Sequence, residues 1–327
     1  MTASAETSAS ARGPQKRAPD FFIVGQPKSG TTALYEMLRR HPQIYMSDVK
    51  EPRFFARDLR VSVQSSSPLP ETLDQYLSLF SAARPEQRTG EATTSYLRSR
   101  TAAQRIAELR PDARIIAIFR EPASFLRSMH LELLQIHVET EKDLGKAIAL
   151  DEVGRQGKEI PDSPIQQLSR YSVERVRYVE QLRRFHAVFP SEQVLVLIYD
   201  DFRADNEGTV RQVLRFLEVD DTSPIEVTEA NPTVRVRSPG LYELVRSLYL
   251  GRGPAARTVK AGIKALTPQQ LRHDALAMQR RVQWGKPRPP DERLMLELRQ
   301  RFKGEVVALS EYLGRDLVTL WGYDSIG

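Results

Sequence analysis

The stretch Phe21-Phe22-Ile23-Val24-Gly25-Gln26-Pro27-Lys28-Ser29-Gly30-Thr31-Thr32 decides the fold predicted for this chain. Its first four residues are apolar, which is typical of a strand that is buried on both faces. The two glycines permit a tight turn, and the apolar spacing after Thr31 predicts a helix that ends at His41-Pro42. When a helix begins directly after a strand and a tight turn, its free backbone N–H groups and the positive end of its dipole point at one place. The stretch therefore predicts a phosphate site.

The loop is close to a Walker A loop but differs from it at one residue. Gly25, Gly30 and Thr32 keep the spacing G-x-x-x-x-G-K-[ST], whereas Thr31 occupies the lysine position. The lysine is Lys28, inside the loop, where it can reach the bridging oxygen of a donor shorter than a triphosphate. In a kinase, by contrast, the Walker lysine binds the β and γ phosphates and the hydroxyl binds magnesium. A glycine-rich turn without a ligand is the simpler alternative, because short motifs of this kind give false matches.

The composition indicates a soluble globular protein. The chain has 327 residues, of which 40% are hydrophobic, and this permits one large α/β domain. No apolar run approaches the roughly 20 residues that span a bilayer. Residues 1–19 are rich in Ala, Ser and Thr without an apolar core, which predicts a disordered tail rather than a secretory signal. We therefore expect a cytoplasmic protein without a membrane span, folded as one domain over residues 20–327.

The charged and metal-binding residue types narrow the ligand classes. Cysteine is absent and the five histidines lack the spacing of metal ligands, so neither thiolate chemistry nor a bound metal is expected. The net charge of +6 favours an anionic ligand. The basic residues are scattered and no recognised binding motif accompanies them, so nucleic acid is not an expected partner.

Strand-like and helix-like segments alternate along the chain. After the first strand, we expect strands at 44–46, 113–119 and 193–199 and a strand end within 90–96. Helices are expected at 73–80, 101–110, 125–133, 171–185, 210–217 and 291–313. This alternation predicts an α/β fold, a single domain with a central parallel sheet flanked by helices. Residues 141–165 contain several Gly and Pro residues and are expected to form a mobile insertion.

Polar residues follow the predicted strands at the edge where α/β folds bind ligands. The strand 113–119 ends at Arg120, and the next helix carries Ser128. Glu51 lies between Lys50 and Arg53, beside two phenylalanines. The plainer alternatives are a salt bridge for Arg120, a surface hydroxyl for Ser128 and a surface ion pair for Glu51.

Taken together, these motifs resemble the sulfotransferases that use 3′-phosphoadenosine 5′-phosphosulfate (PAPS). Pro27-Lys28-Ser29-Gly30-Thr31-Thr32 resembles the 5′-phosphosulfate loop of that family. The strand end at Arg120, with Ser128 eight residues on, resembles its 3′-phosphate motif. The likeness extends to Trp321, because Leu313-Gly314-Arg315-Asp316-Leu317 resembles the C-terminal segment of bacterial members. The resemblance implies the P-loop-like sulfotransferase fold.

The heparan-sulfate and bacterial branch is the most similar. Lys50-Glu51-Pro52-Arg53-Phe54-Phe55 resembles the segment that carries its catalytic glutamate, and Gly90-Glu91-Ala92-Thr93-Thr94-Ser95-Tyr96 resembles the acid-and-hydroxyl motif that follows. The resemblance implies Glu51 as the general base, Glu91 as the alternative base and Lys28 as a catalytic residue. It also implies a donor site formed by Lys28, Ser29, Gly30, Thr31, Thr32, Arg120, Ser128 and, in a looser match of a basic loop, Lys286.

The resemblance implies transfer of a sulfuryl group from PAPS, without a metal, to a hydroxyl of a small-molecule or glycan acceptor. The Ala- and Arg-rich composition suggests bacterial secondary metabolism. Two other classes stay open at this point. A P-loop kinase of a small alcohol would need the Walker lysine that Thr31 replaces, and ATP turnover with magnesium would identify it. A non-catalytic nucleotide-binding protein would have no need to keep Lys28, Glu51 and Arg120 together.

Overall fold

The structure, a computed structural model of the chain, describes residues 17–59, 69–136, 138–155, 171–227, 235–236, 284–285 and 289–326. The described residues belong to two compact units. The first unit comprises the described parts of Met1–Arg120 and Tyr178–Ala230, and the second those of Glu121–Arg177 and Asn231–Gly327. No helix within the described ranges combines the length and the apolarity that a bilayer crossing requires.

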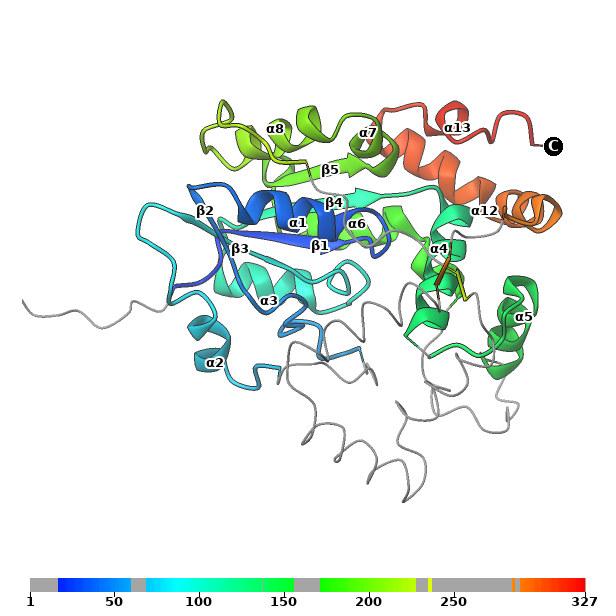
Figure 1. The fold of residues 1–327 in the computed structure, drawn as a ribbon, viewed down its shortest axis with the longest axis horizontal. Coiled ribbons are helices and arrows are strands. Elements are labelled where there is room, and N and C mark those ends of the chain that lie inside the picture. Colours follow the sequence, from blue (N-terminus) through cyan, green and yellow to red (C-terminus); the bar gives the residue numbers. More distant parts are fainter. Residues whose placement is uncertain are drawn as a thin grey trace, which may run out of the picture. The chain divides into compact units, whose positions relative to one another are not determined.

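The first unit contains a five-stranded sheet in which every pair of neighbours is parallel (Figure 1). In spatial order its strands are β2 (Ile44–Met46), β3 (Arg88–Ala92), β1 (Phe21–Gly25), β4 (Arg114–Phe119) and β5 (Val194–Ile198). Strand β1 is central, and its first four residues are fully buried. The predicted central parallel sheet flanked by helices is confirmed.

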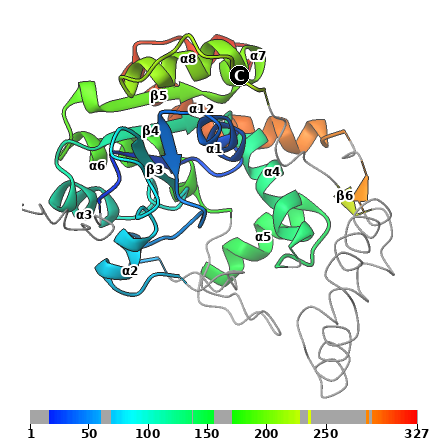
Figure 2. The same ribbon diagram turned by 60° about the vertical axis from the view of Figure 1, so that its left-hand side comes forward.

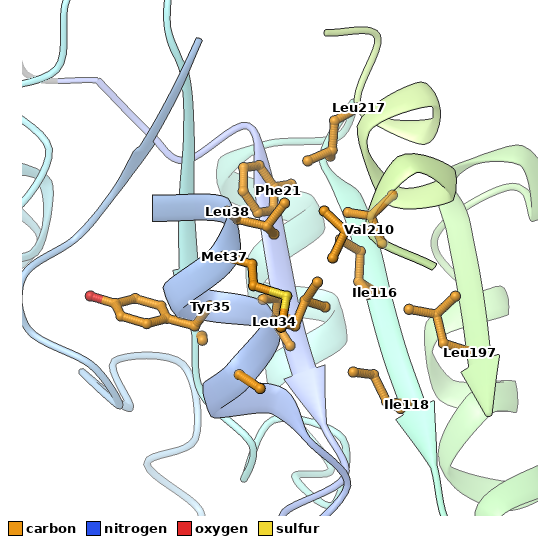
Figure 3. Packing of buried hydrophobic residues seen from close by; sticks show 14 of the residues in the cluster. Phe21, Leu34, Tyr35, Met37, Leu38, Ile116, Ile118, Leu197, Val210 and Leu217 are labelled. Atoms are coloured by element: carbon orange, nitrogen blue, oxygen red, sulfur yellow. The ribbon is translucent and has the colours of Figure 1, made fainter. Parts of the chain in front are cut away.

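Helices α1 (Thr31–Arg39), α7 (Tyr199–Ala204) and α8 (Asn206–Phe216) pack against one face of the sheet. Alternate residues of β1, β4 and β5 point to that face. The core between these elements includes Phe21, Leu34, Leu38, Ile116, Ile118, Leu197 and Val210 (Figure 3). Burial of this apolar surface fixes how α1 leaves the end of β1, and so where the loop between them lies.

The other face of the sheet carries α6 (Tyr178–His186), whose first residue packs its ring against Phe119 with the centroids 4.6 Å apart. Helix α3 (Ala102–Leu109) lies beside α6 (Figure 2). Phe22 points to this face too and meets the ring of Phe55. Short helix α2 (Leu73–Ser78) contributes Tyr76 to the same aromatic group.

A buried carboxylate fastens the start of the sheet. Asp20, immediately before β1, accepts hydrogen bonds from the backbone N–H of Thr89 at 2.7 Å and from its hydroxyl at 3.0 Å. Arg17 and Arg110 pair with the same carboxylate at 3.0 and 2.9 Å. Charge-assisted bonds to a buried acid are strong, so Asp20 holds β1, β3 and the residue that follows α3 together.

The second unit is built on two helices that pack together, α4 (Pro122–Gln135) and α12 (Glu292–Leu313). Glu121 caps α4 by accepting hydrogen bonds from the N–H groups of Ala123 and Ser124, and it also accepts one from the Tyr323 hydroxyl at 2.5 Å. The unit also includes α13 (Leu317–Leu320), α5 (Leu144–Arg155), a 3₁₀ turn at Val173–Arg175, and the antiparallel pair β6 (Arg235–Val236) and β7 (Trp284–Gly285).

The structure adds one helix to the prediction and shortens another. Residues 141–165 were expected to form a mobile insertion, and within them 144–155 form α5, because Asp143 accepts a hydrogen bond from the N–H of Lys146 and two apolar residues of the helix are buried. Residues 171–185 were expected to be one helix, but α6 begins only at Tyr178, where the chain enters the first unit. Residues 156–165 lie outside the described residues.

Candidate functional site

The predicted phosphate loop connects the central strand to α1. Gly30 precedes α1 in a left-handed conformation with a φ of 84°, and no side chain of the described residues caps the helix. A Cβ at Gly30 would lie 2.9 Å from the ring of Phe202, so the turn requires glycine for space as well as for φ. The N–H groups at this helix start are not taken by a side-chain cap, which is the arrangement that binds anions.

The side chains of the loop differ in exposure. Lys28 is half-buried and has a φ of 61°, a left-handed conformation that is uncommon outside glycine. Ser29 is fully buried, and its hydroxyl lies 3.5 Å from the carbonyl oxygen of Pro27. Thr31 is buried and Thr32 is half-buried. We therefore expect Ser29 to offer a phosphate its N–H group rather than its hydroxyl.

Arg120 lies directly against this loop. It follows β4, the strand next to β1, and its Nη1 donates a hydrogen bond to the carbonyl oxygen of Lys28 at 2.9 Å. Its guanidinium lies over the ring of Tyr199, 4.6 Å from the centroid, and the Tyr178 hydroxyl donates to its carbonyl oxygen at 3.0 Å. The structure therefore brings together Arg120 and Lys28, which the sequence placed on separate motifs.

The two tyrosines around Arg120 were not among the predicted site residues. Tyr199 follows β5 directly, as Arg120 follows β4, so its place at the carboxyl edge of a parallel sheet was a usable signal. Tyr178 gave no such signal, because it reaches Arg120 from the start of α6 on the other face of the sheet.

Glu51 is held at the end of β3. Its N–H donates to the carbonyl oxygen of Ala92 at 3.0 Å, and the N–H of Arg53 donates to the hydroxyl of Thr93 at 3.3 Å. Thr93 in turn donates its N–H to the carbonyl oxygen of Ile23 in β1 at 3.0 Å. Glu51 thus lies at the sheet edge from which the phosphate loop leaves.

The carboxylate of Glu51 is partly exposed and hydrogen-bonded. Its side chain is 23% exposed, and it accepts hydrogen bonds from the hydroxyl of Thr94 at 3.0 Å and from the Thr94 N–H at 3.2 Å. Lys50 Nζ lies 3.6 Å from one oxygen, and Arg53 Nε lies 4.0 Å from the other. The ion pair that was the plainer alternative is therefore present, on a carboxylate that solvent can still reach.

Glu91 lies in the opposite environment. It is fully buried on β3, and neither of its oxygens has a hydrogen-bond partner of normal geometry among the described residues. Burial, together with a smaller contribution from the charge of Glu51, raises the pKa of Glu91 to about 8, against the lowering effect of the Tyr96 and Tyr76 hydroxyls. Glu91 is therefore neutral near pH 7 and shielded from solvent, and Glu51 is the more accessible of the two candidate bases.

Two further predicted residues are not part of the described first unit. Ser128 is on α4 in the second unit, where it is buried, and its hydroxyl has no hydrogen-bond partner among the described residues. Lys286 lies outside the described residues. Those ranges contain no group of three or more acidic or histidine side chains placed to hold a metal ion.

Comparison with known proteins identifies relatives that are named as sulfotransferases. The chain is 25% identical over 245 residues to carbohydrate sulfotransferase 15 of Mus musculus, in an alignment covering 62% of this chain and 44% of the relative. It is 28% identical over 207 residues to the bifunctional heparan sulfate N-deacetylase/N-sulfotransferase 3 of Homo sapiens, covering 62% of this chain and 22% of the relative. The chain thus spans less than half the length of these curated relatives.

A solved structure and a family profile also match sulfotransferases. The crystal structure of a sulfotransferase from Alicyclobacillus acidocaldarius matches with a TM-score of 0.64 and 24% identity, over 93% of this chain and 99% of that one. This likeness shows that the two chains share a fold. The profile of the sulfotransferase family matches residues 19–223, more than half of the chain and the part that holds Lys28, Glu51, Glu91 and Arg120. The chain therefore belongs to the sulfotransferase family.

Proposed function

We propose that this protein transfers a sulfuryl group from PAPS to a hydroxyl of a small-molecule or glycan acceptor. The observation that carries the proposal is the shared sheet edge. The uncapped start of α1 with Lys28 follows β1, the guanidinium of Arg120 follows the neighbouring strand β4, and Glu51 is held at the end of β3, the neighbour of β1 on its other side. A glycan acceptor is supported by the names of the relatives, which refer to carbohydrate and heparan sulfate. An acceptor from bacterial secondary metabolism stays a prediction from composition.

The donor would be bound at both of its phosphate ends. Lys28 and the N–H groups of residues 29–32 would hold the 5′-phosphosulfate, because a left-handed glycine and an uncapped helix start suit an anion. Arg120 would bind the 3′-phosphate. One of its guanidinium N–H groups donates to the carbonyl oxygen of Lys28, and a guanidinium has five N–H donors in all. Ser128 and Lys286 would bind the 3′-phosphate too, as the sequence motifs predict.

The reaction would be an in-line substitution at sulfur. The acceptor oxygen forms a bond to sulfur as the bond from sulfur to the phosphate oxygen breaks, and Glu51 takes the acceptor proton. The electron pair of the broken bond stays on the leaving phosphate, where Lys28 and the loop N–H groups stabilise the charge. Glu51 is preferred over Glu91 as the base because its carboxylate is partly exposed, whereas that of Glu91 is buried and neutral.

The test is a sulfuryl-transfer assay with PAPS and two acceptors, para-nitrophenol and N-acetylglucosamine, read by the mass shift of the acceptor. Glu51→Gln should lower kcat by about 10²–10⁴-fold and leave the affinity for 3′-phosphoadenosine 5′-phosphate (PAP) unchanged, because the general base acts in the transition state. Lys28→Ala should weaken PAP binding by about 10-fold, because a charged hydrogen-bond donor is lost.

A matched control is Lys142→Ala, which removes an exposed lysine of the second unit. It should leave kcat and PAP affinity as they are in the wild type. Transfer at the wild-type rate by both Lys28→Ala and Glu51→Gln would refute the proposed roles, and magnesium-dependent ATP turnover without PAPS turnover would favour a kinase.

A further inference from the structure

Thr94 is the residue that touches the carboxylate of Glu51 most closely. We propose that Thr94 is a positioning residue, which holds Glu51 so that its Oε2 atom receives the acceptor proton. The inference rests on the proposed function, because it assigns an orientation to the base of that reaction. Thr94 itself is not required to touch the acceptor or the donor.

The hydrogen bonds to the two carboxylate oxygens are unequal. Oε1 accepts from the Thr94 hydroxyl at 3.0 Å and from the Thr94 N–H at 3.3 Å, and Lys50 Nζ lies 3.6 Å from it. Among the described residues, Oε2 accepts a hydrogen bond only from the Thr94 N–H, at 3.2 Å, and Arg53 Nε lies 4.0 Å from it. Each carboxylate oxygen has about two lone-pair sites. The lone pairs of Oε1 are therefore occupied by hydrogen bonds from Thr94, whereas Oε2 still has a lone pair that can accept a proton.

Three consecutive residues hold Glu51 in place. Glu51 and Arg53 both have left-handed backbones, with φ of 61° and 55°, which side-chain-bearing residues adopt only when neighbouring structure enforces it. The carbonyl oxygen of Ala92 binds the Glu51 N–H, the hydroxyl of Thr93 binds the Arg53 N–H, and Thr94 binds the carboxylate. The first two contacts fix the main chain, and the third fixes the side chain.

The charges that face Glu51 would move its carboxylate if Thr94 released it. Lys50 and Arg53 attract it from its own segment, and the buried Glu91 repels it only where Glu91 is itself ionised, above about pH 8. Without the Thr94 hydroxyl, the two cations become the main competitors for the carboxylate. The carboxylate would then turn toward them and lose the orientation that the transfer needs.

The decisive variant is Thr94→Val, which keeps the shape and the N–H group and removes the hydroxyl. We expect kcat with PAPS and para-nitrophenol or N-acetylglucosamine to fall roughly 10-fold, as for loss of one hydrogen bond to a charged group. The KM for PAPS should stay within about twofold of the wild-type value, since the donor site is untouched. Thr94→Ser, which keeps a hydroxyl at this position, should keep kcat near the wild-type value.

Two controls make the test specific. Thr222→Val removes a hydroxyl that donates to the exposed carboxylate of Asp220 at 2.6 Å, and it should leave kcat unchanged. In the Glu51→Gln background, Thr94→Val should have no further effect on kcat, because Thr94 acts through Glu51. If Thr94→Val does not fold, Thr94→Ala takes its place, with circular dichroism as the check on folding.

The outcomes separate the inference from the proposed function. If the wild type is active and loss of the Thr94 hydroxyl leaves kcat unchanged, the inference alone is overturned. A further loss of kcat on adding Thr94→Val to Glu51→Gln does the same, because it shows a role independent of Glu51. A wild type that transfers no sulfuryl group to either acceptor overturns the proposed function, and the inference with it.

Discussion

At the scale of single residues, Glu51 and Glu91 lie close enough for their charges to interact but differ in almost every other respect. Glu51 is partly exposed and hydrogen-bonded to Thr94, whereas Glu91 is enclosed by β3 and the rings of Tyr76 and Tyr96. Burial of Glu91 lowers the free energy of unfolding at high pH, because the buried site favours the neutral carboxyl group while the unfolded chain favours the ionised one.

Replacement of Glu91 by Gln should stabilise the protein at alkaline pH. The folded-state pKa of about 8 lies above the ordinary value of 4.5, so the folded protein keeps a proton that the unfolded chain loses between these values. The free energy of unfolding of the wild type therefore falls as pH rises through this window and stays low above it. Glu91→Gln should match the wild type below the window and exceed it above, by at most about 5 kcal/mol.

Urea denaturation on either side of the window would measure this difference. Glu71→Gln, at an exposed position, is the matched control and should follow the wild type at every pH. A Glu91→Gln protein whose free energy of unfolding runs parallel to that of the wild type across the window would show that Glu91 ionises normally.

Tyr199 offers a second prediction at this scale. Its ring lies under the guanidinium of Arg120, and such a contact contributes about 0.5–2 kcal/mol. Tyr199→Ala should therefore weaken PAP binding by about 3- to 30-fold, while Tyr199→Phe, which keeps the ring, should bind PAP nearly as the wild type does. Calorimetric titration with PAP measures both, and equal affinities for the Ala and Phe variants would contradict the role given to the ring.

At the scale of elements, the connection from β1 to α1 depends on glycine. Gly30 has a left-handed backbone, and a Cβ there would meet the ring of Phe202 at 2.9 Å. Gly304, in the middle of α12, has nothing within 4 Å of a Cβ. The same substitution should therefore have opposite effects at the two positions.

Gly30→Ala should lower the free energy of unfolding by about 1–3 kcal/mol and impair PAP binding, because the loop must move to relieve the strain. Gly304→Ala should raise the free energy of unfolding by about 0.5–1 kcal/mol, because alanine has the higher helix propensity, and should leave PAP binding unchanged. Chemical denaturation and PAP titration of both variants provide the measurement. A stable Gly30→Ala protein with normal PAP affinity would mean that the loop tolerates a side chain.

The strands were predictable from sequence because a buried parallel strand is a short apolar run, and 113–119 and 193–199 are such runs. Helix α5 was not predictable in the same way, because two glycines lie within it and weaken its helical pattern. Its start depends on the side chain of Asp143 and its place on tertiary burial. Helix α6 begins where the chain passes from the second unit into the first, and no local sequence pattern indicates that position.

The candidate site shows the same limit. Motif spacing was enough to select Lys28, Glu51 and Arg120, since each follows or borders a recognisable strand. The contacts between them were not predictable, because the bond from Arg120 to the Lys28 carbonyl and the hold of Thr94 on Glu51 join residues 92 and 43 positions apart. The raised pKa of Glu91 likewise depends on how deeply β3 is buried.

At the scale of the whole molecule, donor binding should be visible as stability. A ligand that binds only the folded protein adds about 2.7 kcal/mol to the free energy of unfolding at a concentration 100 times its Kd. For a protein of this size that corresponds to a rise in Tm of about 4 °C. PAP should give this rise, and ADP, which lacks the 3′-phosphate, should give a smaller one.

A thermal melt of the wild type with each nucleotide tests this prediction, with Lys28→Ala as the variant whose Tm should respond weakly to both. Equal rises with PAP and ADP would show that the 3′-phosphate is not recognised, and would remove the role proposed for Arg120.

The buried carboxylate of Asp20 has a practical consequence for anyone who shortens the gene. A protein that starts after Asp20 would leave the N–H and hydroxyl of Thr89 and the guanidinium of Arg110 without their acceptor. Expression of a trimmed version should therefore begin no later than Arg17, whose own side chain closes the same cluster.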